Sequence, residues 1–225
     1  MREFDLLSIY PNFTKRVITK NTRSIKNRIN ASYKDKRFYD GKRNDGFGGY
    51  KNDGRWAPIA ERIFSIYKLK DNAKILQIGC DKGFLLYEIK KKYKSSLVRG
   101  IENSKYPISK APKLIKKNIK YSDYTKLPFK NNFFDFVIAI GPVYSLNLRD
   151  AIRCLIEIAR VGKGKSFITL GAYENDNEKK LFEYWTLLGC TILSKKDWKH
   201  VLRHVRFTGD YKFNTSNSLN LKLRK

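Results

Sequence analysis

The residues best suited to ligand chemistry lie around a glycine turn. An apolar run over 75–78 ends at Gly79, and a helical pattern begins at Phe84, directly after Gly83. Glycine allows a tight turn, and it lets backbone amides approach a ligand that a side chain would exclude. A strand, glycine turn and helix in this order are typical of nucleotide binding, although two glycines can also simply end a strand.

An acidic residue follows this turn at an informative distance. Glu102 ends a second apolar run, over 97–101, and lies 23 residues beyond Gly79. An acid about 20 residues past a glycine turn, at the tip of the next strand, is placed to accept hydrogen bonds from both hydroxyls of a ribose. The alternative is an acid that stabilises a helix N-terminus. The spacing favours the ribose interpretation.

Two further segments follow in a recognisable order. A Tyr-Ser-Asp-Tyr segment at 121–124 precedes a Leu-Pro-Phe segment that runs to Phe-Asp at 127–135, and an apolar run follows at 136–140. Over roughly residues 70–172 the chain therefore resembles the class I S-adenosylmethionine-dependent methyltransferases, of the type 11 group. Their pattern is a strand with a glycine turn, a strand ending in an acid, an Asp before the Leu-Pro-Phe segment, and a buried fourth strand.

This resemblance implies a fold, a cofactor and several contacts. It implies a Rossmann-like α/β fold, with a seven-stranded, mostly parallel sheet, helices on both faces and a C-terminal antiparallel hairpin. It implies S-adenosylmethionine as cofactor, with Asp123 accepting from the adenine amino group, Tyr124 alongside, and Ile140 and Gly141 beneath the methionine portion. The alternative for Asp123 is a carboxylate that only stabilises a turn.

The chain departs from the family pattern at two positions. Gln77 stands where the family usually places an acid, and Asp81 stands where it usually places a glycine. The first change removes a charge near the ammonium group of the cofactor, and the second adds a side chain where backbone should meet the ligand. Either Asp81 replaces the missing carboxylate, or the fold has lost its chemistry. The retained glycines and acids favour the working enzyme.

The segment 38–56 holds five glycines among five aromatic residues. Such a backbone predicts a mobile loop, but exposed aromatic side chains predict a covering role. We expect Tyr50, Arg55 and Trp56 to close over the cofactor, with Arg55 meeting its carboxylate. A structural cap on the sheet edge is the alternative. The Asp-Gly-Arg-Trp-x-Pro phrase at 53–58 is similar to that of bacterial class I methyltransferases with an N-terminal cap, loosely associated with surface-glycan or specialised small-molecule pathways.

Candidates for the acceptor side follow the fourth and fifth strands. Tyr144 is the catalytic candidate, and Tyr173 and Glu174 lie in the corresponding place after the next strand. Open α/β sheets bind ligands at these carboxyl ends, although a rim-packing role is equally compatible with the sequence. Methyl transfer from a sulfonium is an in-line displacement, so positioning can supply most of the rate. His200 and His204 lie four apart but lack a third ligand, and we expect no metal.

The elements that must position these residues follow from periodicity and breakers. Strands are expected near 74–78, 97–102, 119–122, 134–140 and 166–170. Helices are expected within 1–37, from 58 to 67, and over 149–161, 178–188 and 195–205, the last with Ser194 as N-cap. Strands 209–213 and 219–223 are expected to form the hairpin. The domains are a cap over 1–56 and a methyltransferase domain over 57–225.

Composition limits the classes of function. The chain has 225 residues, enough for one α/β domain, and no apolar run approaches the roughly 18 residues of a membrane span. Three cysteines, at 80, 154 and 190, favour reduced thiols in a cytoplasmic protein. The net charge of +27 suits nucleic acid, but it is dispersed along the chain, with its densest runs at 90–94 and 113–120. A solvated basic surface is therefore favoured over a nucleic-acid footprint.

Three functions are compatible with the sequence. The favoured one is methylation of an oxygen or nitrogen of a small molecule. The second is an RNA or protein methyltransferase that uses the basic surface, and the third is a non-catalytic binding protein on the same fold. Gly-Pro-Val-Tyr at 141–144 stands where an Asn-Pro-Pro-Tyr-like tetrad would indicate methylation of exocyclic base amines. Its absence argues against that kind of acceptor.

Overall fold

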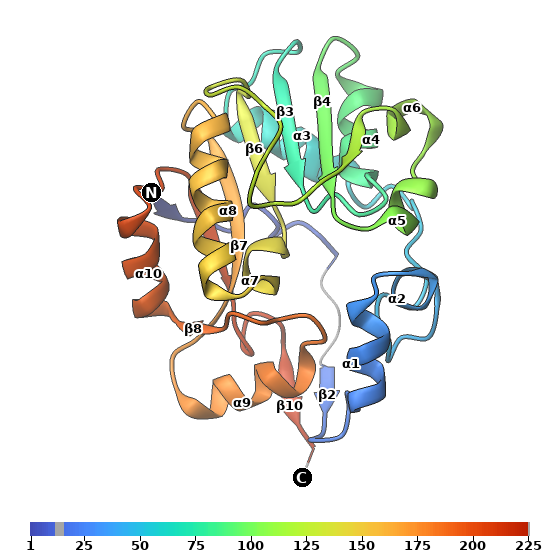
Figure 1. Cartoon of the computed structure of the whole chain (residues 1–225), viewed down its shortest axis with the longest axis vertical. Helices are drawn as coiled ribbons and strands as arrows, with labels where there is room; N and C mark the ends of the chain where they lie inside the picture. The colour runs from blue at the N-terminus through green and yellow to red at the C-terminus, as the bar shows by residue number, and fades with distance from the viewer. Residues whose placement is uncertain (12–15, 225) are drawn as a thin grey trace.

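The computed structural model describes residues 1–11 and 16–224. A central sheet dominates it (Figure 1). Its strands are β1 (Arg2–Glu3), β3 (Lys74–Ile78), β4 (Leu97–Glu102), β5 (Ile119–Tyr121), β6 (Phe136–Ala139), β7 (Ser166–Tyr173), β8 (Leu193–Ser194) and β9 (Asp210–Asn214). The strand order is β1-β9-β7-β6-β3-β4-β5, with β8 attached to β7. All strand pairs of this sheet within the described residues are parallel.

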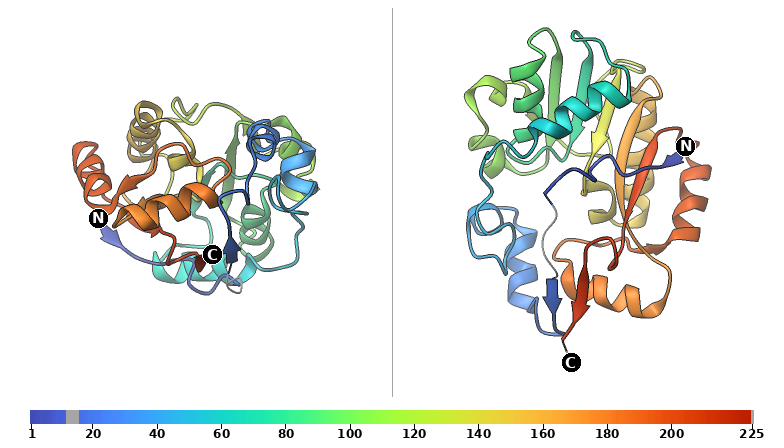
Figure 2. Two further views of the ribbon diagram at one scale, coloured as in Figure 1. Left: turned by 90° about the horizontal axis from the view of Figure 1, so that it is seen from below. Right: turned by 180° about the vertical axis from the view of Figure 1, so that it is seen from behind.

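Helices cover both faces of the sheet. They are α3 (Ala57–Ile66), α4 (Phe84–Lys92), α5 (Lys105–Ser109), α6 (Lys113–Lys116), α7 (Pro142–Ser145), α8 (Leu148–Val161) and α10 (Lys195–His204). One core packs α8 and α10 against the sheet, and a second packs α3 and α4 against it. The view from behind shows α3 lying across the face opposite to α8 (Figure 2). The sheet is therefore buried on both sides, which explains the continuous apolar runs of its strands.

Local sequence accounts for the main boundaries. The side chain of Asn147 accepts from the backbone N–H of Asp150 and begins α8, which ends at Gly162. In β3, Ile75 and Leu76 belong to opposite cores, as alternation along a strand requires. Ser194 caps α10 by accepting from the N–H of Asp197. The expected central strands, the helices near 58–67, 149–161 and 195–205, and this cap are confirmed.

A second group of elements lies below the sheet in Figure 1. It contains α1 (Ile25–Ser32), α2 (Lys36–Asp40), α9 (Asp176–Trp185) and a two-stranded parallel sheet of β2 (Arg16–Ile18) and β10 (Leu221–Leu223). Helix α9 contacts both β2 and β10. This group, called the lower lobe, therefore joins the first and last parts of the chain around α9. It faces the carboxyl ends of the central strands.

Two expectations about the chain ends need correction. The described part of 1–37 is helical only in α1 and the start of α2, because β1 pairs with β9 at the sheet edge and β2 pairs with β10. Residues 12–15 of that prediction lie outside the described residues. Two C-terminal strands are present, but β9 pairs in parallel with β7 and β10 pairs in parallel with β2. Their partners lie far away in sequence, so local patterns could not identify them. The division at residue 56 stays a prediction.

Candidate functional site

A cavity of about 820 Å³ lies at the carboxyl ends of β3, β6 and β7 and extends toward the lower lobe. Ten of the candidate residues line it: Tyr50, Arg55, Trp56, Gln77, Gly79, Asp81, Tyr124, Ile140, Gly141 and Tyr144. Gly83, Glu102 and Asp123 are described but lie outside its lining. Most of the candidates, drawn from four separate segments, thus meet around one space large enough for a nucleoside-sized ligand and an acceptor.

The glycine turn is required by packing as well as by backbone conformation. Gly79 has φ +64°, and a Cβ there would lie 3.0 Å from the ring of Pro142. Gly83 has φ +75°, and a Cβ there would lie 2.6 Å from Cδ1 of Ile115. These contacts are with protein atoms, whereas we had expected a ligand to impose the glycines. Close packing of the turn against its neighbours keeps it in this shape.

Asp81 and Glu102 form a pair of neighbouring carboxylates. Asp81 has φ +51°, and its backbone N–H donates to the Glu102 carboxylate at 3.0 Å. Glu102 is fully buried, and it also accepts from the N–H of Ser104 at 3.1 Å and the hydroxyl of Tyr124 at 3.2 Å. Asp81 and Tyr124 form the cavity wall next to Glu102. Its three hydrogen bonds therefore come from protein groups.

The side chain of Asp81 faces a buried phenol. The hydroxyl of Tyr39, which is fully buried, donates to Oδ1 of Asp81 at 2.8 Å. Burial and the neighbouring Glu102 carboxylate raise the pKa of Asp81 to about 7. At neutral pH this carboxyl group lies near the midpoint of its titration, so a cation in the cavity would favour its charged form.

Gln77 brings a buried acceptor to the cavity. Its side chain is 5% exposed, and within the described residues its Oε1 has no hydrogen-bond partner. A buried amide oxygen without a donor costs about 1–3 kcal/mol. A ligand that carries an N–H donor, such as an ammonium group, would remove this cost. The contact of Gln77 with the cofactor stays a prediction.

The β6 end places Tyr144 beside the same cavity. The N–H of Gly141 donates to Oγ1 of Thr169 at 2.9 Å, and this bond ties the turn after β6 to β7. Tyr144 lies one turn further on, with its backbone oxygen bonded to the N–H groups of Cys190 and Thr191. Burial raises the pKa of Tyr144. Tyr144 therefore presents a neutral phenol. Such a group can form hydrogen bonds with a methyl acceptor, but it is not an anionic base.

The aromatic residues of 38–56 form a stacked layer over the cavity. Ring centroids lie 5.7 Å apart between Tyr39 and Phe47, 4.5 Å between Phe47 and Tyr50, and 4.8 Å between Tyr50 and Phe84. Trp56 donates from Nε1 to the Tyr50 hydroxyl at 3.2 Å. The ring contacts thus reach Phe84, the first residue of α4 after the glycine turn. Whether the layer moves with the cofactor stays a prediction.

Arg55 is paired within the same segment. Its guanidinium makes an ion pair and several hydrogen bonds with Asp53, two residues earlier. It also lies 5.8 Å from the ring of Tyr10. The predicted contact with a cofactor carboxylate would therefore compete with Asp53.

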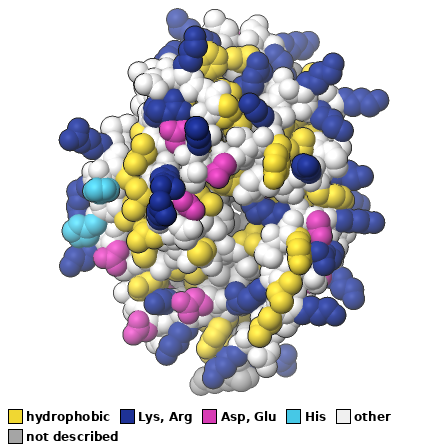
Figure 3. Space-filling view, viewed as in Figure 1, with side chains coloured by type: hydrophobic (Ala, Val, Ile, Leu, Met, Phe, Trp, Pro, Cys, Tyr) yellow, Lys and Arg dark blue, Asp and Glu magenta, His cyan; other side chains and the backbone are white. Residues whose placement is uncertain are grey.

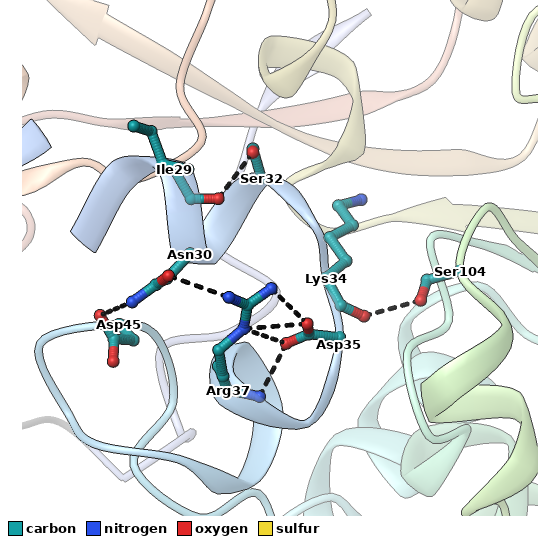
Figure 4. Close-up of polar contacts among 8 residues, drawn as sticks. All are labelled: Ile29, Asn30, Ser32, Lys34, Asp35, Arg37, Asp45 and Ser104. Atoms are coloured by element: carbon teal, nitrogen blue, oxygen red, sulfur yellow. Dashed lines mark hydrogen bonds and ion pairs between the residues drawn. The ribbon is translucent and has the colours of Figure 1, made fainter. Parts of the chain in front are cut away.

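Polar contacts that local sequence patterns did not reveal tie the segment 38–56 and the preceding turn to the loops that follow β3 and β4. Lys82 is 5% exposed, and its ammonium donates to Asp40 at 2.6 Å and to the backbone oxygen of Tyr50 at 2.8 Å. The hydroxyl of Ser104 donates to the backbone oxygen of Lys34 at 2.7 Å, at the turn between α1 and α2 (Figure 4). The position of Lys82 inside the glycine turn could have suggested a buried ion pair. Its acidic partner lies 42 residues away, so the sequence did not identify it.

Asp123 and the histidines make other contacts. Oδ1 of Asp123 accepts from the N–H of Thr125 at 2.7 Å, as a turn-stabilising carboxylate does. Its adenine role stays a prediction. Nδ1 of His200 lies 3.1 Å from the guanidinium of Arg203. Among residues 1–11 and 16–224, no group of three His, Cys, Asp or Glu side chains is arranged to hold a metal ion.

Comparisons with known proteins agree with this geometry. Residues 76–170 match the family model of the methyltransferase domain. Cycloartenol-C-24-methyltransferase of Arabidopsis thaliana is 34% identical over 114 residues, which cover 47% of this chain and 32% of that protein. Cycloartenol-C-24-methyltransferase 1 of Oryza sativa subsp. japonica is 32% identical over 102 residues, which cover 42% of this chain and 29% of that protein. The chain thus spans about a third of the length of these curated relatives.

Solved structures share the fold at low identity. The YcgJ protein of Bacillus subtilis superposes with a TM-score of 0.53 at 14% identity, covering 65% of this chain and 66% of that one. A protein of Bacillus halodurans C-125 described as a methyltransferase gives 0.52 at 18% identity, covering 65% and 67%. The [4+2]-cyclase SpnF gives 0.50 at 16% identity, covering 66% and 57%. These likenesses concern the fold alone.

The parallel sheet, its glycine turn and the cavity at its carboxyl edge define a Rossmann-like, nucleotide-binding α/β protein. Residues 76–170 of this arrangement match the methyltransferase domain, and that match supports a relation to the class I S-adenosylmethionine-dependent methyltransferase family.

Proposed function

We propose that this chain is a methyltransferase that uses S-adenosylmethionine to methylate an oxygen or nitrogen of a small molecule. The observation that carries the proposal is the buried, unpartnered Oε1 of Gln77 at a cavity that the glycine turn and Tyr144 also line. The cofactor supplies an electrophilic methyl group on a sulfonium. The protein holds donor and acceptor in line and keeps water out.

The residues divide the task by position. Gln77 and Asp81 would hold the ammonium group of the cofactor, one with an amide oxygen and one with a carboxylate. Glu102 would accept hydrogen bonds from the ribose hydroxyls. Its present donors include the N–H of Asp81 and the hydroxyl of Tyr124, and these would have to move for the ribose to bind. Tyr144 would orient the acceptor through its phenol. No residue need act as a strong base if the acceptor is already nucleophilic.

The substitution Gln77→Leu tests this proposal. It removes the acceptor at nearly constant volume, so the affinity for S-adenosylhomocysteine should fall about tenfold or more while the free energy of unfolding rises, because a buried orphan oxygen is lost. Gln77→Glu is the matched variant, and it should bind at least as tightly as the wild type. Calorimetry and urea unfolding give both quantities. Unchanged affinity in Gln77→Leu, or in Glu102→Gln for the ribose contact, would contradict the corresponding assignment.

The RNA or protein methyltransferase remains the second candidate because of the basic charge. Lys and Arg side chains spread over the whole visible face in Figure 3, with no single stripe. The runs at 90–94 and 113–120 begin on α4 and α6, and most of their lysines are exposed. Such a surface predicts weak, sequence-independent binding that is lost above about 200 mM salt. Tight binding of one RNA at that salt would favour this candidate.

The fold by itself does not decide among reactions, since a [4+2]-cyclase shares it. The non-catalytic alternative therefore depends on Gln77 and Asp81. A protein that bound neither S-adenosylmethionine nor its demethylated product would support that alternative. The described residues contain no helix long and apolar enough to cross a membrane.

A further inference from the structure

The cavity continues well beyond the predicted cofactor contacts. Its far wall is formed by β2, the loop at 43–47 and the segment 185–189 that follows α9. Most of that segment is apolar, including Trp185 and Leu187. This half of the space faces Tyr144, and it is not needed to explain any of the cofactor assignments above.

Three arginines gather on this far wall: Arg16, Arg23 and Arg43. The guanidinium of Arg16 lies 5.4 Å from the ring of Trp185. Arg23 donates to the backbone oxygens of Arg43 and Asn44, each at 2.7 Å. Arg43 donates to a backbone oxygen of its own loop. Backbone carbonyls thus help to orient the cluster, and a carbonyl does not neutralise a guanidinium charge.

The cluster is electrostatically unfavourable on its own. Burial, and then the neighbouring charge of Arg43, lower the pKa of Arg16. Burial, followed by the charges of Arg43 and Arg28, does the same for Arg23. Arg23 makes no ion pair with a carboxylate in the described part of the chain. Partly buried cations that repel one another are stabilised most by a bound anion.

The acids of the cavity lining have other partners. Asp53 is paired with Arg55, and Asp81 accepts from Tyr39. Asp45, which acts on Arg23 from outside the lining, accepts from the amides of Asn27 and Asn30. The cavity lining therefore holds more basic than acidic side chains, and three of the basic ones lie at the end away from the predicted cofactor contacts.

We propose that Arg16, Arg23 and Arg43 bind a phosphate ester carried by the methyl acceptor, with the body of the acceptor lying along Trp185 toward Tyr144. This inference rests on the proposed methyltransferase function. Guanidinium groups bind phosphate oxygens in bidentate geometry, and a dianion neutralises more of a three-charge cluster than a carboxylate does. The apolar wall would hold the uncharged part of the same molecule.

Binding of phenyl phosphate tests this inference. The probe combines an aromatic ring with a dianion, phenol is its neutral counterpart, and titration calorimetry gives the affinity of each. Arg16→Gln and Arg43→Gln should each weaken binding about tenfold or more, because each removes a charged hydrogen-bond donor. Arg149→Gln removes the same charge from an exposed position on α8, outside the cavity lining. It should change the affinity less than twofold.

Several outcomes would overturn the inference. Equal weakening in Arg149→Gln would mean binding to the general basic surface. Phenol binding as tightly as phenyl phosphate would remove the role of the anion. An RNA oligomer that competes with the probe and depends on Arg16 would identify a polymeric acceptor. Arg43 lies at an exposed position, so its variant keeps the test valid if Arg16→Gln fails to fold.

Cofactor binding separates this inference from the proposed function. S-adenosylhomocysteine should bind the wild type, Arg16→Gln and Arg43→Gln with equal affinity. A parallel loss in the two variants would mean that the cluster binds the cofactor carboxylate, which contradicts the inference but not the enzyme class. A wild type that binds phenyl phosphate but no S-adenosylhomocysteine would instead contradict the methyltransferase proposal.

Discussion

Replacing Asp81 with Asn should stabilise the protein at pH 8 and leave it little changed at pH 4. The pKa of Asp81 is raised to about 7 by burial and by Glu102. At low pH the carboxyl group is protonated in both folded and unfolded chains. As pH rises from about 4 to 7, the unfolded chain ionises while the folded chain keeps its proton, so the free energy of unfolding falls. Above pH 7 this loss is complete.

The magnitude follows from the distance between the two pKa values. The folded value of about 7 lies roughly three pH units above the ordinary 3.8, and each unit corresponds to about 1.4 kcal/mol. The upper limit is therefore about 4 kcal/mol. Asp81 keeps part of its surface exposed, so solvent screening should reduce the effect to about 1–3 kcal/mol. Asn keeps an oxygen for the Tyr39 hydroxyl, and it tolerates the φ of +51°.

Urea unfolding of wild type and Asp81→Asn at intervals between pH 4 and 8 gives the comparison. The difference between their free energies of unfolding should grow with pH and level off above about 7. Asp53→Asn is the control: Arg55 lowers the pKa of Asp53 to about 2, so the effect of Asp53 on the free energy of unfolding is complete by about pH 5 and stays constant from there to pH 8. If the free energies of unfolding of wild type and Asp81→Asn changed with pH in parallel, burial and Glu102 would not raise the pKa of Asp81, and the reasoning would be refuted.

Three further predictions address the cofactor site and its supports. If Asp81 compensates for Gln77, Asp81→Gly should weaken binding of S-adenosylhomocysteine and the added Gln77→Asp should restore it, with non-additivity of about 0.5–3 kcal/mol in calorimetry; additive effects would count against compensation. Gly83→Ala should lower the melting temperature more than Gly141→Ala, because both have positive φ but only Gly83 has neighbours within 4 Å of the added Cβ; equal losses would contradict a role for packing. Segment 51–54 is exposed and should be cleaved by protease more slowly with S-adenosylhomocysteine, whereas equal rates would mean a static cap.

Local sequence determined the central fold and the edge of the sheet at which the cavity lies. Apolar runs such as 74–78 and 97–102 match β3 and β4 to the residue, because strands buried on both faces leave a continuous apolar signature. The cap at Ser194 depends on a side chain and a backbone N–H three residues apart, so it too was visible in the sequence. The glycine turn marked the edge of the sheet where the cavity lies.

Only the tertiary structure decided how distant segments meet at the site. The N-terminal strands are stabilised by pairing with β9 and β10, about 200 residues away, whereas the sequence alone suggested helices there. The partners of Asp81 and Lys82 come from α2, and the arginine cluster comes from β2 and two loops. Hydrogen bonds and charge repulsion depend on distances in space. Local periodicity records which faces are buried but not which side chains will meet across the chain.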